Sequence, residues 1–523
     1  MSNLGLVLKD MYNKAFQLYG DKTAINFKDE RITYKELDKQ SNQLAHAFIQ
    51  NGIKIETPIA LLMSNCIEFA IADLAIMKIG ATKIPLNHIL NRNEILYMLE
   101  QSNVKAIICG PESYSIISDI REKLPFLEVI IALSNSVPKG FISMKSFIQN
   151  MPKTAPDLDV EPSNIASIQY TGGTTGVPKG IVQTQEKIAL NLLCEIIELE
   201  LVEQDEILLM TPLVHGAGKF LESGLLKGAS HIIFEKFDPL LALNVIKQKG
   251  NIVTFMVPTM IYRLLDAIDQ YQIKVSPNDI KTIAYAASPI MEERLKQGLK
   301  QFGPVFYQFY GQSECPNFIT RLRKSDHSLD SDKIHRLRSC GTPSFMANVK
   351  IVDEKGKEVP KGEQGEIVVK APYVMERYHN MPEKTNETIV NGWLHTGDIG
   401  KMDDEGYVYL LDRKNDMIVT GGLNVYSTEV ENIIQKFPGI KQVAVIGVPH
   451  FDWGEQIIAL VVPDPNKPPL KDDLLSYCKI NLAKYKQPKE IKFVSELPLT
   501  SYGKLDKKKM REPYWRKEQR LIN

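Results

Sequence analysis

From Pro58 to Phe309 the sequence alternates short apolar runs with longer amphipathic stretches, and this alternation restricts the possible folds more than any other feature. Short runs rich in Ile, Val and Leu are typical of buried strands, whereas apolar residues at every third or fourth position, as over 291–302, predict helices. Alternating strands and helices predict an α/β fold with stacked, mostly parallel sheets that bind ligands where their strands end. The expected strands are Pro58–Met63, Lys105–Cys109, Glu128–Leu133, Ile165–Tyr170, Ile207–Met210, His231–Phe234, Ile252–Val257, Thr282–Tyr285 and Val305–Phe309.

After this region the pattern changes to short strands joined by turns rich in Gly, Asp and Glu. The expected strands Val349–Val352, Glu366–Lys370 and Tyr407–Leu411 favour a small antiparallel β-barrel or sheet. A new β/α pattern follows Asp412, with a capping-box helix start at Thr428 to Glu431 and strands over 442–448 and 457–462. We therefore expect a large N-terminal domain over residues 1–412 and a small α+β C-terminal domain over residues 413–523.

Charge and cysteine content exclude several classes of protein. The 63 basic and 63 acidic residues give a net charge of zero, which argues against a nucleic-acid partner and against an acidic disordered chain. The six cysteines form no C-x-x-C pair, so a metal–thiolate site is not expected, and such scattered cysteines suit a reducing compartment. With no signal peptide and no apolar stretch able to span a bilayer, a cytoplasmic enzyme is the expectation.

The stretch Tyr170-Thr-Gly-Gly-Thr-Thr-Gly-Val-Pro-Lys-Gly180 is the most informative motif. Glycines allow backbone N–H groups to approach phosphate oxygens, threonine hydroxyls add donors, and a lysine supplies positive charge. The pattern does not fit a Walker A loop. The candidate phosphate-binding residues are Thr171, Gly172, Gly173, Thr174, Thr175, Gly176 and Lys179.

This stretch resembles the phosphate loop of the adenylate-forming superfamily, which includes acyl-CoA and aryl-CoA synthetases, adenylation domains of peptide synthetases and luciferases. Further motifs of the superfamily occur downstream in order. Tyr310-Gly311-Gln-Ser313-Glu314 resembles its Y-G-x-T-E, with serine in place of threonine. The resemblance implies that Tyr310 stacks on adenine, Ser313 faces the α-phosphate and Glu314 holds Mg²⁺ through a hard oxygen.

Two further motifs extend the resemblance toward the ribose and the hinge between the domains. Asp398 is the last residue of a stretch that resembles the family's T-G-D. It is the expected ribose clamp, since one carboxylate can accept hydrogen bonds from both ribose hydroxyls. Asp412-Arg413 resembles the start of the hinge motif, with Arg413 expected at the ribose or phosphate. The family usually has Asp or Lys where this chain has Asn415, which leaves the energetics of the hinge open.

Three segments resemble parts of the family's acyl and thiol sites. His215 matches the aromatic or histidine position at the acyl entrance, and Ser288 belongs to a small-residue wall beside adenine. Gly421 and Gly422 resemble the loop that faces the pantetheine tunnel. For all three segments, a purely structural role remains an alternative.

Lys504 ends Pro498-Leu-Thr-Ser-Tyr-Gly-Lys504, which resembles the family's P-x-T-x-x-G-K. An ammonium between the carboxylate and the α-phosphate orients the nucleophile and stabilises the charge that develops on phosphorus. The resemblance therefore implies that Lys504 is the catalytic residue of adenylation, assisted by His215 and Glu314. Lys507, Lys508 and Lys509 are expected to be solvated.

The resemblance implies an acid–CoA ligase that uses ATP, Mg²⁺ and CoA with a small-molecule carboxylic acid, fatty or aromatic. A hydrolase elbow is disfavoured because its nearest match, Gly311-Gln-Ser-Glu-Cys315, lacks the second glycine. A penicillin-recognising site is disfavoured because its companion motifs are missing, and a non-enzymatic binding module is the remaining class. The chain ends 19 residues after Lys504 without a carrier domain, which favours CoA over a separate carrier protein as acceptor. No acidic residue near His215 suits an amino-acid amine, and Lys219 is expected in a surface ion pair, with contact to a substrate oxygen as the alternative. Homodimers are common in the family.

Overall fold

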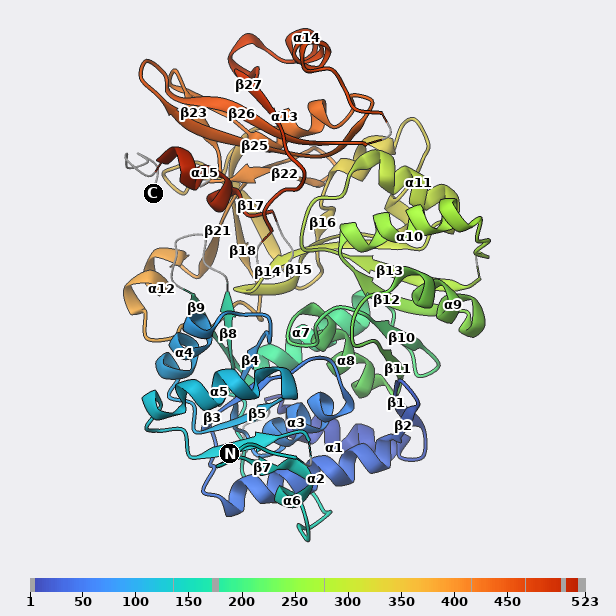
Figure 1. Ribbon diagram of the computed structural model, residues 1–523, viewed down its shortest axis with the longest axis vertical. Helices are drawn as coiled ribbons and strands as arrows, with labels where there is room; N and C mark the ends of the chain where they lie inside the picture. Colours follow the sequence, from blue (N-terminus) through green and yellow to red (C-terminus); the bar gives the residue numbers. More distant parts are fainter. Residues whose placement is uncertain are drawn as a thin grey trace. The chain divides into compact units, whose positions relative to one another are not determined.

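The computed structural model of the chain describes residues 5–134, 136–171, 178–276, 278–414, 416–465, 467–499 and 505–515 (Figure 1). The chain forms two compact units. Unit 1 comprises residues 1–348 and 370–394, and unit 2 comprises residues 349–369 and 395–523.

In the described part of unit 1 there are two large sheets, and the first has nine strands. Its central strands pair in parallel, and both ends are closed by an antiparallel pair. Along the sheet the strands are β16 (Thr342–Pro343), β15 (Cys315–Leu322), β14 (Phe306–Gln312), β13 (Ile280–Tyr285), β12 (Ile252–Met256), β10 (Glu206–Leu209), β11 (Ser230–Ile233), β1 (Thr23–Phe27) and β2 (Glu30–Thr33). The five strands predicted between residues 207 and 309 are confirmed as β10 to β14.

The second sheet of unit 1 has eight strands, again parallel in its interior and antiparallel where β8 meets β9. The four strands predicted between residues 58 and 170 are confirmed. In order they are β19 (Arg377–Tyr378), β9 (Lys179–Thr184), β8 (Ile165–Thr171), β4 (Thr82–Leu86), β3 (Pro58–Leu62), β5 (Ala106–Cys109), β6 (Val129–Ala132) and β7 (Ile142–Ser143). A short strand, β20 (Ile389–Val390), pairs with Trp393 and Leu394.

The helices of unit 1 cover these sheets and fill the space between them. Helix α7 contacts β8 and β9 of one sheet and β15 of the other, and it packs on α8. In Figure 1 both helices lie in the green middle of unit 1. The helices are α1 (Leu8–Tyr19), α2 (Tyr34–Gln50), α3 (Ile67–Lys78), α4 (Arg92–Gln101), α5 (Tyr114–Ile120), α6 (Met144–Phe147), α7 (Gln185–Glu198), α8 (Gly216–Lys227), α9 (Pro239–Lys249), α10 (Pro258–Tyr271), α11 (Glu292–Phe302) and α12 (Pro382–Thr388).

Unit 2 begins with a small sheet in which β17 (Asn348–Val352), β18 (Gln364–Lys370), β21 (Trp393–Met402) and β22 (Val408–Arg413) are neighbours. A second sheet has the order β24 (Leu423–Val425), β23 (Ile418–Thr420), β26 (Gly454–Pro463) and β25 (Ile440–His450), with β27 (Glu490–Phe493) also on β26. The helices of the unit are α13 (Ser427–Ile434), α14 (Lys471–Asn481) and α15 (Lys507–Trp515).

Both faces of the β25–β26 ribbon are buried, because successive side chains of a strand point to opposite faces. Val443 and Val445 share one apolar cluster with side chains of α13 and α14. Ala444 and Ile446 belong to a second cluster that contains Met510 of α15. Helix α15 is therefore packed on the sheet as part of the folded unit.

The predicted capping box at Thr428 to Glu431 is wrong. Helix α13 begins one residue earlier, at Ser427, and no side chain of its N-cap residue caps it. The Thr428 hydroxyl instead donates to the carbonyl of Leu411, and the Glu431 carboxylate accepts from the Val445 N–H at 2.7 Å. Tertiary partners therefore replace the local bonds that the sequence pattern predicts.

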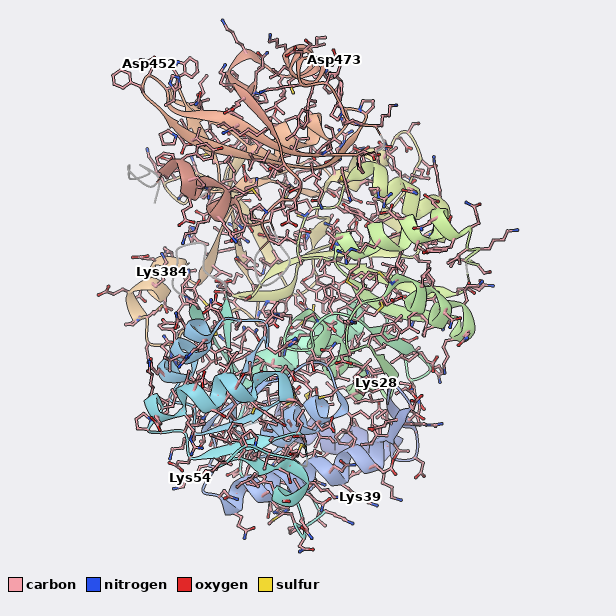
Figure 2. The ribbon with its side chains drawn as sticks, viewed as in Figure 1. Lys28, Lys39, Lys54, Lys384, Asp452 and Asp473 are labelled. Atoms are coloured by element: carbon pink, nitrogen blue, oxygen red, sulfur yellow. The ribbon has the colours of Figure 1, made fainter. Side chains whose placement is uncertain are left out.

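Charged side chains of both signs project from the two units (Figure 2). Lys39 and Lys54 are exposed on unit 1, and Asp452 and Asp473 on unit 2. All six cysteines are free thiols. Among the described residues, no helix is long and apolar enough to cross a membrane.

Candidate active site

The β8–β9 hairpin carries the two described ends of the predicted phosphate loop. Thr171 is the last residue of β8 and lies opposite Lys179, the first residue of β9, in the antiparallel register. Residues 172–176, the other predicted members of the loop, lie outside the described residues. The hairpin therefore places one threonine and one lysine side by side at the end of the second sheet.

The β14–β15 hairpin carries Tyr310, Gly311, Ser313 and Glu314. Gln312 pairs with Cys315, so Ser313 and Glu314 form the two-residue turn. A Cβ at position 311 would lie 2.6 Å from the backbone nitrogen of Asn317, which explains why only glycine fits there. The Tyr310 side chain is largely buried. The motif thus forms a tight hairpin with a polar tip.

Tyr378 connects the two hairpins of unit 1. Its hydroxyl donates to Oε1 of Glu314 at 2.7 Å, and Nζ of Lys179 lies 4.9 Å from the centre of its ring. The residue is held in place because β19 pairs with β9, with Tyr378 opposite Ile181. Burial and the nearby Glu314 carboxylate raise the pKa of Tyr378, so its hydroxyl stays a donor. The Glu314 carboxylate and the Lys179 ammonium therefore both contact the side chain of Tyr378.

Helix α7 makes two hydrogen bonds to the β14–β15 hairpin next to its turn. Asn191 donates to the carbonyl of Pro316 at 2.8 Å, and Asn317 donates to Oε2 of Glu195 at 2.6 Å. Glu195 is fully buried and also accepts from the Ser223 hydroxyl at 2.7 Å. Burial raises the pKa of Glu195 to about 7, although its two hydrogen bonds act in the opposite direction.

His215 and Ser288 lie where strands of unit 1 end. His215 is half-buried and occupies the N-cap position of α8. Its Nε2 lies 3.3 Å from the side-chain Nδ2 of Asn87, the residue that follows β4. Ser288 follows β13 and is preceded by Ala287, whose φ of 78° is strained for a residue with a Cβ. Backbone strain of this kind is often retained at binding sites.

Lys219 is paired in a buried network rather than at the surface. Its Nζ lies 2.7 Å from Oε2 of Glu222, whose other oxygen lies 2.8 Å from Nζ of Lys83. Lys83 also pairs with Asp73 at 2.5 Å. The expected ion pair is therefore present, but its carboxylate is only 3% exposed.

Asp398 and Arg413, which come from two separate sequence motifs, are neighbours in unit 2. They are paired in the register of β21 and β22, and Nε of Arg413 lies 2.8 Å from Oδ1 of Asp398. Asp398 is buried, whereas the Arg413 side chain is 47% exposed. The ion pair therefore fixes the orientation of the Asp398 carboxylate, and the Arg413 side chain that fixes it is accessible to solvent.

Gly421 and Gly422 form the two-residue turn between β23 and β24, where Thr420 pairs with Leu423. Their φ angles of 57° and 76° suit the hairpin turn that requires positive φ at both central residues. A Cβ on either glycine would meet no atom within 4 Å. Backbone geometry alone therefore explains both glycines, and the turn has open space beside it.

Lys504 and Asn415 lie outside the described residues. The prediction that Lys507 is solvated is wrong: its side chain is 11% exposed, and its Nζ lies 2.7 Å from Oε1 of Glu431. Lys508 and Lys509 are exposed, as predicted.

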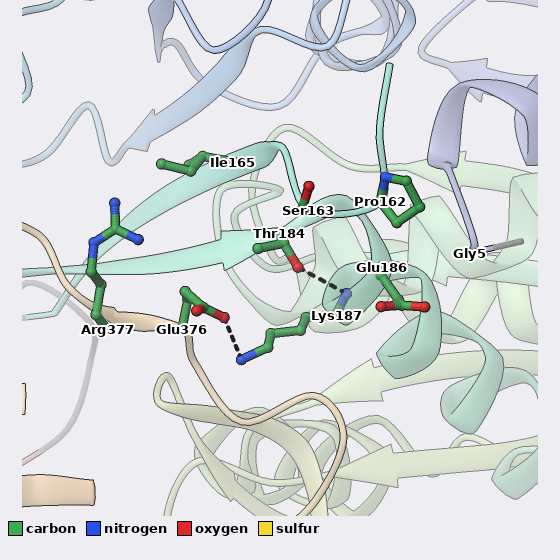
Figure 3. Close-up of a pocket in the computed structure, with 9 residues that line it drawn as sticks. All are labelled: Gly5, Pro162, Ser163, Ile165, Thr184, Glu186, Lys187, Glu376 and Arg377. Atoms are coloured by element: carbon green, nitrogen blue, oxygen red, sulfur yellow. Dashed lines mark hydrogen bonds and ion pairs between the residues drawn. The ribbon is translucent and has the colours of Figure 1, made fainter. Parts of the chain in front are cut away.

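A polar hollow of about 570 Å³ lies at the other end of the β8–β9 hairpin (Figure 3). Thr184 and Ile165 line it, and the ion pair between Lys187 and Glu376, 2.8 Å long, crosses it. Of the predicted site residues that the structure describes, none lines this hollow. It therefore does not mark the site that the motifs predict.

Sequence reasoning missed Tyr378, Glu195 and Asn191. None of them belongs to a motif, and each reaches the site only through long-range pairing of β19 or α7 with other elements. One signal was present for Glu195: it stands at a position of α7 where the apolar pattern predicts a buried side chain.

Comparison with known proteins decides the family. The model of the AMP-binding enzymes matches residues 12–379, and the model of their C-terminal domain matches residues 429–504. The chain belongs to the AMP-binding enzymes. Within this adenylate-forming superfamily it falls in the acyl-CoA synthetase branch.

Relatives of this AMP-binding enzyme differ in their named substrates. A medium/long-chain-fatty-acid–CoA ligase of Mycobacterium tuberculosis is 33% identical over 96% of this chain and 89% of its own. A feruloyl-CoA synthase of Amycolatopsis is 32% identical over 94% and 96%. The solved o-succinylbenzoate CoA synthetase of Bacillus subtilis, in complex with its acyl-adenylate intermediate, has a TM-score of 0.84 and 27% identity over 96% and 97%.

Proposed function

We propose that this AMP-binding enzyme is an ATP-dependent acid–CoA ligase that joins a fatty or aromatic carboxylic acid to CoA through an acyl-AMP. The Glu314–Tyr378–Lys179 arrangement carries this proposal, because it sets a carboxylate and a cation at the phosphate hairpin. CoA ligases among the relatives support the choice of acceptor.

In the first step, the substrate carboxylate oxygen attacks the α-phosphorus of ATP, and the bond to the β-phosphate oxygen breaks to release pyrophosphate. Lys179 and Thr171 hold the phosphates, together with residues 172–176, and Ser313 donates to the α-phosphate. Lys504 orients the incoming carboxylate against the α-phosphate. Tyr310 supports the adenine beside Ser288, and His215 stands at the acyl entrance.

The residues present fit a magnesium ion that arrives with ATP. Within the described part of the chain, no cluster of three or more His, Cys, Asp or Glu side chains could hold a metal. Mg²⁺ needs no such cage, since one or two carboxylates plus substrate phosphates satisfy it. Glu314 would hold the ion through the oxygen that Tyr378 does not occupy, and the ion would neutralise phosphate charge.

In the second step, the CoA thiol attacks the acyl carbon, the thioester bond forms, and AMP leaves with the electrons of the broken C–O bond. We propose a domain boundary between Asp412 and Arg413, with rotation about 412–415 between the steps. The rotation would exchange Lys504 for the Gly421–Gly422 turn. Hinge rotation of this kind allows one chain to favour two reactions in turn.

Asp398 would accept hydrogen bonds from the two ribose hydroxyls, while Arg413 fixes the orientation of the Asp398 carboxylate. We also propose a cytoplasmic location, which the six free cysteines support.

An acid panel tests the proposal. Exchange of labelled pyrophosphate into ATP is measured with short, medium and long-chain fatty acids and with aromatic acids, and each active acid is then incubated with ATP and CoA. We expect at least one acid to support exchange and to yield acyl-CoA and AMP. Exchange without any thioester would contradict the choice of CoA, and loading of a carrier protein instead would identify a different acceptor.

A further inference from the structure

Lys507 lies in a buried ionic site of unit 2. Its ammonium pairs with Oε1 of Glu431 at 2.7 Å and donates to the Ser427 hydroxyl at 2.5 Å. Both partners belong to α13, whose first residue is Ser427. Its sequence neighbours Lys508 and Lys509 are exposed. One of three consecutive lysines is thus used to join α15 to α13.

The same site includes the first residue of the predicted hinge. Oδ2 of Asp412 accepts from the Ser427 N–H at 2.5 Å, so this carboxylate lies at the N-terminus of α13. Burial raises the pKa of Asp412 to about 6, while the charge of Lys507 acts in the opposite direction. Burial would lower the pKa of Lys507, but the carboxylates of Glu431, Asp412 and Asp416 reverse the effect. Lys507 therefore lies within the field of the hinge carboxylates.

A second ion pair and two further contacts fix the rest of α15. Nη2 of Arg511 lies 2.8 Å from Oδ1 of Asp416, close to the hinge in sequence. Met510 is buried in the apolar cluster of the β25–β26 ribbon, and the Trp515 indole donates to the carbonyl of Gly447 at 3.1 Å. Arg511 thus pairs with a residue close to Asp412 in sequence, whereas Lys507 pairs with Glu431 of α13, the helix whose first N–H donates to Asp412.

Helix α15 is also joined to the chain on the other side of Lys504. Leu499 and Leu505 form an antiparallel bridge, and the Asp506 N–H donates to the Pro498 carbonyl at 2.9 Å. Leu499 and Leu505 are thus held against each other, and Lys507 is two residues from Leu505. Whatever fixes Lys507 therefore also fixes these two described residues on either side of Lys504.

We propose that Lys507 is a positioning residue for adenylation: its contacts with Glu431 and Ser427 tie Leu499 and Leu505, the described residues on either side of Lys504, to α13, so that Lys504 turns together with α13 when the chain rotates about 412–415. The proposal rests on the proposed function, because it assigns Lys507 to the half-reaction that Lys504 serves. Buried ion pairs contribute little net stability compared with apolar side chains of similar size. A role in placement therefore accounts for this buried charge better than a role in stability.

Lys507→Met tests the proposal, since it keeps an unbranched, flexible side chain that is shorter by one heavy atom and removes its charge. The two half-reactions are measured separately: pyrophosphate exchange for adenylation, and thioester formation from supplied acyl-AMP and CoA. We expect the exchange kcat to fall about 10- to 100-fold, the range that small displacements of a catalytic group produce. We expect the KM for ATP and the rate of thioester formation to stay within about twofold of the unmodified enzyme.

Lys508→Met is the matched control, because it makes the same substitution on the exposed neighbour, and it should leave both half-reactions unchanged. Lys507→Arg, which keeps the charge, should restore most of the exchange rate. Lys504→Ala gives the reference for complete loss of adenylation with thioester formation retained. If Lys507→Met does not fold, Glu431→Gln makes the same comparison by removing the partner charge.

Equal loss of both half-reactions in Lys507→Met, together with a lower Tm, would overturn the proposal and leave Lys507 a structural residue. Exchange at the unmodified rate would overturn it as well. Failure of the proposed function would look different, because the unmodified enzyme would then show no exchange with any acid.

Discussion

At the scale of single residues, the site depends on side chains that connect the motifs as well as on the motifs themselves. Tyr378 holds Glu314 by a hydrogen bond and lies beneath Lys179, although neither partner is near it in sequence. A hydrogen bond to a charged group contributes about 1.5–3 kcal/mol. Tyr378 therefore belongs to the proposed site even though it has no reactive role.

Tyr378→Phe should lower the rate of adenylation and raise the Mg²⁺ concentration needed for half-maximal exchange. Loss of the hydrogen bond to Glu314 predicts a fall of about 10- to 100-fold at limiting Mg²⁺. The measurement is pyrophosphate exchange over a series of Mg²⁺ concentrations. Tyr373→Phe is a control in the same segment, because Tyr373 donates to the buried carbonyl of Phe318: it should lower the Tm without changing the Mg²⁺ requirement. An unchanged Mg²⁺ requirement in Tyr378→Phe would count against a role for this residue at Glu314.

Asp398→Ala should raise the KM for ATP about 10-fold or more, since charge-assisted hydrogen bonds to the ribose would be lost. Steady-state exchange kinetics at varied ATP measure the effect. The control is Asp404→Ala, which removes an exposed carboxylate from a turn in the same unit. Should Asp398→Ala leave the KM for ATP unchanged, Asp398 would not be the ribose clamp.

The motif residues could be predicted because each lies in a short string whose chemistry is visible in sequence. Tyr378 and Lys507 could not, because their neighbours are set by the pairing of β19 with β9 and by the packing of α15 on the β25–β26 ribbon, which brings Lys507 to Glu431. Lys507 stands among three lysines that look alike in sequence, and only the fold distinguishes the buried one.

At the scale of elements, apolar runs and their spacing predicted the strands well, but local signals failed where tertiary partners replaced them. All nine strands expected before residue 310 are present. Strand β4 was missed because Lys83 interrupts its apolar pattern, and that charge is tolerated because Asp73 and Glu222 pair with it. The start of α13 was misplaced because its first N–H, that of Ser427, donates to Asp412 rather than to a neighbour in sequence.

Helix α7 supports the β14–β15 hairpin through a buried carboxyl, which predicts an unusual dependence of stability on pH. Burial raises the pKa of Glu195 to about 7, so the folded chain keeps this proton while the unfolded chain has already released it. The Glu195 contribution is therefore fully present at low pH and is lost as pH rises toward 7.

Glu195→Gln replaces the titratable carboxyl with an amide. The amide keeps an oxygen that can accept from Asn317, and it can also form a hydrogen bond with the Ser223 hydroxyl. The difference in free energy of unfolding, variant minus unmodified enzyme, should increase between pH 5 and pH 8 by up to about 3 kcal/mol. Urea denaturation at the two pH values measures it. A difference that does not change with pH would show that Glu195 is ionised in the folded chain throughout this range.

At the scale of the whole molecule, the zero net charge leaves the attraction of ATP to local cations. Lys179, over the ring of Tyr378, supplies one of them, and Arg413, although paired with the buried Asp398, keeps a side chain that is 47% exposed. Elsewhere, basic side chains such as Lys83 and Lys507 are neutralised by buried carboxylates. Positive charge is thus left for substrate at the motifs that the sequence singled out.

The central claim is that one chain catalyses two successive reactions through an acyl-AMP. The most direct measurement mixes concentrated enzyme with ATP and an active acid in the absence of CoA, and quenches the reaction before and after CoA is added. We predict about one equivalent of acyl-AMP and pyrophosphate per chain before the addition, and its conversion to acyl-CoA and AMP afterwards. Formation of ADP and phosphate, or of thioester without prior acyl-AMP, would contradict the account.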